Sequence, residues 1–125
     1  MRLLLDTNIL IGFLEKTLDA RLREVLSNPE NTVHVSVASL WEIAIKVRLG
    51  KLPFKTPLEH TPKAIEATGT ELLNILAAHV LVLVEPAPAT RDPFDRLLLA
   101  QCALERMQLV TTDRALMSHP LAWRP

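Results

Sequence analysis

The sequence is poor in the residues that nucleotide-binding loops and disulfides require. Its 125 residues include three glycines, one cysteine and no tyrosine. Gly12, Gly50 and Gly69 lie far apart, so no glycine-rich loop is present to cradle a phosphate. Cys102 has no partner for an internal disulfide, and its aliphatic neighbours favour a buried structural thiol. These shortages exclude a nucleotide-binding loop of the P-loop or Rossmann type and a disulfide-stabilised fold.

An excess of charge and a long hydrophobic run are also missing. Lys plus Arg and Asp plus Glu number 14 each, so any binding of nucleic acid must come from a local patch. The start "MRLLLDTN" is too short for the hydrophobic part of a signal peptide. The longest apolar stretch, 72–84, contains Asn74 and His79 and falls short of the roughly 20 residues that span a membrane. We therefore predict a soluble cytoplasmic protein without a membrane partner.

The remaining pattern alternates strands with helices along what we expect to be a single domain, residues 1–125. Strands are predicted at 2–5, 32–36, 108–111 and 121–123, and helices at 10–26 as a pair, 37–49, 63–68, 93–107 and 114–117. Residues 71–84 fit a strand or a helix. Such alternation favours an α/β fold with a parallel sheet covered on both faces.

Three aspartates stand where predicted strands end or predicted helices begin. Asp6 and Asp113 each follow a short apolar strand, and Asp95 lies in the first turn of a helix. In "TRDPFDRLL", Asp92 suits the N-cap before Pro93, which puts Asp95 at the third helical position. All of them could serve only as helix caps, because a carboxylate near a helix N-terminus is favourable by itself.

Glu42 is not explained by capping, because it lies in the second turn of its predicted helix. It could form a surface ion pair with Lys46, four residues on. Alternatively, Glu42 could join the three aspartates at one edge of the sheet. Two carboxylates about 5 Å apart repel by roughly 3 kcal/mol at an effective dielectric near 20, so such a group implies a hard divalent cation.

Other catalytic groups lack a suitable pattern. The four histidines are scattered without metal-ligand spacing, and no serine stands in a nucleophile-elbow context. We interpret Trp41, Phe94 and Trp123 as core residues, because no interleaving of basic and aromatic residues indicates a platform for base stacking.

With these acids identified, the sequence resembles the PIN-domain ribonucleases, in particular the VapC-type toxins of toxin–antitoxin pairs. The motifs "LLLDTNIL", "SVASLWEIAIKVRLGKL", "RDPFDRLLLAQ" and "LVTTD" occur in this order, and a short strand with "LAW" follows. "SLWEIAIK" and "RDPFDRLL" are the specific ones, whereas "DTN" alone is weak. The resemblance spans nearly the whole chain. It implies a three-layer α/β/α fold with a central parallel sheet, and a helix at 77–84.

The resemblance also implies an endoribonuclease that depends on Mg²⁺ or Mn²⁺. Carried over by position, its metal-binding and catalytic acids fall on Asp6, Glu42, Asp95 and Asp113. We expect Thr7, Asn8, Asp92 and Thr111 to lie beside these ligands, and Arg91, Arg96 and Arg114 to contact phosphates or, alternatively, to pair with neighbouring carboxylates. Many relatives have a histidine where this chain has Thr90; this difference affects a contact to the substrate or to a residue behind the metal ligands, and not the metal ligands themselves.

The implied partners are an RNA substrate, a protein antitoxin and a second copy of the chain in a homodimer. An aspartyl phosphatase is disfavoured, because Asn8 stands where a second acid would follow Asp6. A phosphate receiver is disfavoured too, because no acid pair follows the first strand. The stronger alternative is a PIN-fold module for binding or dimerisation with little catalysis, although all four acids are retained.

Overall fold

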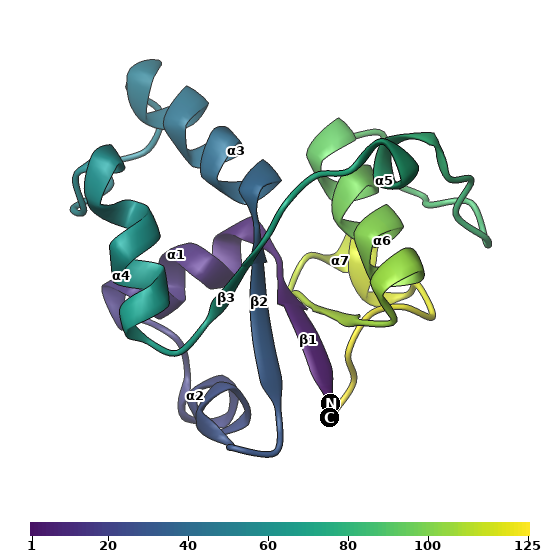
Figure 1. Ribbon diagram of the computed structural model, residues 1–125, viewed down its shortest axis with the longest axis horizontal. Helices are drawn as coiled ribbons and strands as arrows, with labels where there is room; N and C mark the ends of the chain where they lie inside the picture. The colour runs from purple at the N-terminus through teal and green to yellow at the C-terminus, as the bar shows by residue number, and fades with distance from the viewer.

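A four-stranded parallel sheet forms the centre of the computed structural model, which describes residues Met1 to Pro125 (Figure 1). Its strands are β1 (Arg2–Leu5), β2 (Thr32–Ser36), β3 (Glu71–Leu73) and β4 (Gln108–Val110), in the order β3-β2-β1-β4. Leu4 of β1 lies opposite His34 of β2 and Leu109 of β4. β1 therefore lies inside the sheet, and every strand pair is parallel, as predicted.

Helices cover both faces of this sheet. They are α1 (Thr7–Glu15), α2 (Ala20–Ser27), α3 (Val37–Arg48), the 3-10 turn η1 (Leu58–His60), α4 (Thr61–Ala67), α5 (Ala77–Leu81), α6 (Pro93–Glu105) and α7 (Arg114–Met117). Figure 1 shows α2 and α4 on one side of the strands and α5, α6 and α7 on the other. The predicted three-layer α/β/α architecture is confirmed. None of the helices combines the length and the apolar character needed to cross a bilayer.

The core is divided in two by the alternation of side chains along β1. Leu3 and Leu5 pack with residues of α1, α2 and α4, whereas Leu4 packs with residues of α6 and α7. Successive residues of a strand point to opposite faces, so three consecutive leucines serve both halves of the core. Cys102 of α6 is fully buried in the second half, as its aliphatic neighbours predicted.

Helix caps gather at the carboxyl edge of the sheet. Asp6 caps α1 directly after β1, Ser36 caps α3 directly after β2, and Asp113 caps α7 shortly after β4. The N–H of Asp6 also donates to the carbonyl of Val110, which ties the ends of β1 and β4 together at 3.0 Å. Because β1 and β4 are parallel neighbours, the caps that follow them, Asp6 and Asp113, lie at the same edge of the sheet.

Two predicted elements differ from the structure. The helix expected at 77–84 ends at Leu81, because Val82 is extended (ψ 141°) and the chain beyond it places Val84 in the core beside α6. The last strand, expected at 121–123, is reduced to one bridge between Leu109 and Ala122. Beyond this bridge, the guanidinium of Arg124 donates to the carbonyls of Met117 and His119.

Candidate active site

Asp6 is a buried acid held by two hydrogen bonds. It is 4% exposed. Its Oδ1 accepts from the N–H of Thr7 at 2.8 Å, and its Oδ2 accepts from the hydroxyl of Thr111 at 2.7 Å. Burial raises the pKa of Asp6 above its ordinary value, and the charges of Glu42 and Asp113 raise it further, while the two hydrogen bonds act in the opposite direction. Asp6 is thus both the cap of α1 and a buried carboxyl close to two other negatively charged groups.

Glu42 reaches the same edge from α3. The hydroxyl of Thr7 donates to Glu42 Oε1 at 2.7 Å and lies 3.0 Å from the hydroxyl of Ser39. The ion pair with Lys46 also exists, at 2.8 Å from Nζ to Glu42 Oε2. It is not the surface pair considered from the sequence, because the Glu42 side chain is only 9% exposed. This pair raises the pKa of Lys46.

Ser39 was not predicted from the sequence, although it is buried beside Thr7 and Glu42. A signal was available, because Ser39 stands three residues before Glu42 and therefore on the same face of α3. A serine on the buried face of a helix needs a polar partner, and here that partner lies on α1.

Asp92 and Asp95 lie in different surroundings, and the cap predicted for Asp92 is present. Asp92 caps α6, accepting from the N–H groups of Phe94 at 2.8 Å and Asp95 at 3.4 Å. Asp95 is half-buried, and its pKa is raised to about 7. Burial is the largest cause, followed by the negative charges of Asp6, Asp92, Asp113 and Glu42. The structure thus brings all the predicted acids within electrostatic reach of Asp95.

Asp113 is the most open of the four acids. It is exposed and caps α7 through a 2.9 Å bond from the N–H of Ala115. Its own N–H donates to the hydroxyl of Thr111 at 3.0 Å. Thr111 therefore links Asp113 to Asp6 through its hydroxyl.

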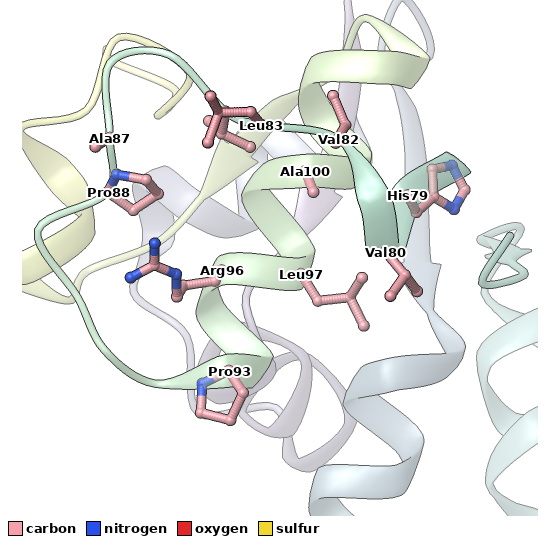
Figure 2. A pocket seen from close by; sticks show the side chains of 11 residues that line it. His79, Val80, Val82, Leu83, Ala87, Pro88, Pro93, Arg96, Leu97 and Ala100 are labelled. Carbon is pink, nitrogen blue, oxygen red and sulfur yellow. The ribbon is translucent and has the colours of Figure 1, made fainter. Parts of the chain in front are cut away.

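The other predicted site residues, Asn8 and the three arginines, form no hydrogen bond or ion pair with the four acids. Asn8 is exposed and its side chain forms no hydrogen bond. Arg91 and Arg114 are exposed and form no ion pair with a carboxylate, so the alternative of paired arginines is wrong for them. Arg96 donates to the carbonyl of Thr90 at 3.1 Å. Figure 2 shows its guanidinium turned toward Pro88, in a pocket of about 340 Å³ between α5 and α6.

The interpretation of Trp41 as a core residue is wrong. Trp41 is 61% exposed, and its ring meets that of Phe94 edge to face, with centroids 5.6 Å apart and planes at 72°. Helical spacing alone did not reveal this, because Trp41 stands beside Glu42, and only one of two neighbours on a helix can face the sheet edge.

The donor chemistry of this site fits a hard divalent cation. The acids offer only carboxylate oxygens, which Mg²⁺ prefers. No three histidine, cysteine or acidic side chains are grouped tightly enough to hold a metal as they stand. Mg²⁺ commonly takes one or two carboxylates and keeps several waters, so a looser arrangement is compatible with it. The raised pKa of Asp95 is a further sign of uncompensated negative charge.

Comparison with known proteins agrees with this geometry. The sequence model of the PIN-domain family matches residues 3–119. Ribonuclease VapC16 of Mycobacterium tuberculosis is 40% identical over 58 residues, a segment that is 46% of this chain and 41% of that relative. A chain in the crystal structure of VapBC2 from Rickettsia felis, bound to a DNA fragment from their promoter, is similar in fold with a TM-score of 0.61. The two are 18% identical, and the alignment covers 98% of this chain and 96% of that one.

Proposed function

Because the chain belongs to the PIN-domain family, we propose that its acidic edge hydrolyses RNA phosphodiesters as a metal-dependent endoribonuclease. The ribonuclease of Mycobacterium tuberculosis supports the reaction, although less than half of that relative is matched. We propose that residues 1–125 form one catalytic domain that acts on RNA in the cytoplasm.

One observation carries this proposal: the pKa of Asp95 is raised to about 7 by burial and by four neighbouring carboxyl groups. The chain as a whole has a formal net charge of zero, so this negative charge is local. Like charges gathered at one place destabilise the fold unless a cation neutralises them. Helix caps alone would not need to converge in this way.

The ligands proposed for Mg²⁺ or Mn²⁺ are Asp6, Glu42, Asp95 and Asp113. Asp6 and Glu42 contribute from the buried end, where Thr7 donates to both through its N–H and its hydroxyl. When bound, the ion supplies a more acidic water and stabilises negative charge on the phosphate oxygens. No protein nucleophile is required.

The chain's own residues orient the acids and bind the substrate. Thr111, directly after β4, donates to Asp6, and Lys46 balances the charge of Glu42. Arg91 and Arg114 are exposed beside the acids and free of ion pairs, so they are suited to contact RNA phosphates. Arg96 donates to the carbonyl of Thr90 from one nitrogen and keeps its other N–H groups for a phosphate.

We further propose that the protein is the toxin of a toxin–antitoxin pair, with a protein antitoxin and a homodimeric state. The structural neighbour from Rickettsia felis is a VapBC2 protein, which supports an antitoxin as partner. Val80, Leu81 and Leu83 are apolar and 63–81% exposed around α5, which favours a protein contact there. The same patch supports the second candidate, a binding or dimerisation module with little catalysis.

Cleavage of a single-stranded RNA by the purified chain, with Mg²⁺, with Mn²⁺ and with excess chelator, tests the function. Asp19 provides a matched control, because it caps α2 through Leu22 at 2.9 Å and is exposed. Asp19→Asn should cleave as wild type does, whereas Asp95→Asn should not. Full cleavage in chelator would reject a metal-dependent mechanism, and no cleavage under any condition would favour the binding module.

A further inference from the structure

Trp41 stands at the rim of the proposed active site with an aromatic face available. It precedes Glu42 on α3, and its partner Phe94 precedes Asp95 on α6. In an edge-to-face pair the partner ring can occupy at most one face of the indole, so at least one face is free of Phe94. Trp41 is also 61% exposed, which is unusual for so large an apolar side chain.

Positive charge is concentrated in the segment that follows. Residues 46–63 contain five Lys or Arg residues and one acid, Glu59, in a chain whose formal net charge is zero. Lys46 is paired with Glu42. The other four are exposed and outside any ion pair, namely Arg48, Lys51, Lys55 and Lys63. This segment therefore carries a local excess of positive charge within a chain that is neutral as a whole.

A groove joins the aromatic ring to the basic segment. It has a volume of about 590 Å³ and lies between α3 and residues 58–62. Trp41 and Arg48 line its α3 side, two helical turns apart and on the same face. Leu58 and Pro62 line the other side, together with Glu59, the single acid of the groove. We call this feature the Trp41 groove.

We propose that the Trp41 groove binds single-stranded RNA on its way to the acidic edge, with one base stacked on Trp41 and phosphates near Arg48. An aromatic face beside unpaired cations is the combination that single-stranded nucleic acids need, because every base has a flat face and every linkage a negative charge. Arg48 lines the groove opposite one acid, and Lys51, Lys55 and Lys63 follow in the same segment as exposed, unpaired cations, which favours a polyanion over a protein segment as occupant. The inference rests on RNA being the substrate of the neighbouring acids.

Binding without cleavage tests this inference separately from the enzymatic proposal. Trp41 and Trp123 are the only tryptophans, so Trp123→Phe leaves Trp41 as a single fluorescent reporter. A short single-stranded RNA in excess chelator should quench its emission, whereas an abasic strand of equal length and charge should not. Trp41→Leu should weaken RNA binding roughly 5- to 150-fold. Leu104→Ala, which alters an exposed leucine near the end of α6, is the matched control and should bind as wild type does.

Arg48→Gln should weaken RNA and the abasic strand alike and lower the salt dependence of binding by about one unit of slope. Equal RNA affinity of wild type and Trp41→Leu overturns the inference and leaves a protein segment as the occupant. Equal quenching by the abasic strand also overturns it. Cleavage with Mg²⁺ but without quenching would overturn the stacking of a base on Trp41 and leave the nuclease proposal intact. Quenching without cleavage would overturn the nuclease proposal alone.

Discussion

The hydroxyl of Thr111 donates a 2.7 Å hydrogen bond to Asp6 Oδ2, although 105 positions separate the two residues. Both side chains are buried, and the bond joins the ends of two neighbouring parallel strands. The same hydroxyl accepts from the N–H of Asp113. One threonine therefore fixes the orientation of a buried acid and the start of the helix that carries another.

Replacing Thr111 by Val should destabilise the protein and reduce its activity. Valine keeps the shape but leaves Asp6 with one donor fewer, at a cost of about 1–3 kcal/mol in the free energy of unfolding. Urea denaturation measures the stability, and RNA cleavage measures the activity. Thr111→Ser keeps the hydroxyl and should restore most of both. If Thr111→Val matched wild type, the bond would have no structural importance.

Asp95→Asn should lower RNA cleavage by at least about a hundredfold, because it removes one charge from the group proposed to bind the metal. Asp92→Asn should leave activity largely intact, because asparagine is itself a good N-cap. Initial rates at saturating Mg²⁺, with circular dichroism to confirm folding, compare the two. Equal losses in two well-folded variants would show that their proposed roles are wrong.

The metal-free protein should lose stability as the pH rises from about 4 to about 7. The pKa of Asp95 is raised to about 7 in the fold from its ordinary value of 3.8, so in this window the folded chain retains a proton that the unfolded chain has released. Unfolding therefore becomes easier with rising pH and levels off above about 7. Melting temperatures measured in chelator across this range check the slope.

Asp95→Asn should flatten this pH dependence, because asparagine does not titrate. The difference in stability between the variant and wild type should therefore favour the variant more at pH 8 than at pH 5. Asp19→Asn, the exposed cap of α2, serves as the control and should leave the slope unchanged. The same slope in Asp95→Asn and wild type would mean that another group titrates.

Mg²⁺ should raise the melting temperature of the wild-type protein by binding the folded state. At a free concentration of 100 times Kd the gain is about 2.7 kcal/mol. A monovalent salt of matched ionic strength is the control, because screening alone also relieves repulsion between the acids. Asp6→Asn should remove the specific part of the gain. Identical curves in Mg²⁺ and in the monovalent salt would mean that the acids serve only as helix caps.

Local features of this chain could be read from the sequence because short-range physics sets them. Asp92 before Pro93 predicts a cap, and the capping bonds span only two or three residues. The strand and helix pattern at 2–5, 32–36 and 37–48 follows from apolar periodicity, and the order of the motifs identified the family. These signals named Asp6, Glu42, Asp95 and Asp113 as candidates.

Contacts between distant residues were decided only by the tertiary structure. Thr7 meets Glu42 because α1 and α3 both start at the carboxyl ends of neighbouring strands, and no local rule contains that pairing. The pKa of Asp95 depends on burial and on charges from four other positions. Likewise, helical periodicity placed Trp41 on a helix but could not tell which of two adjacent faces the rest of the fold would cover.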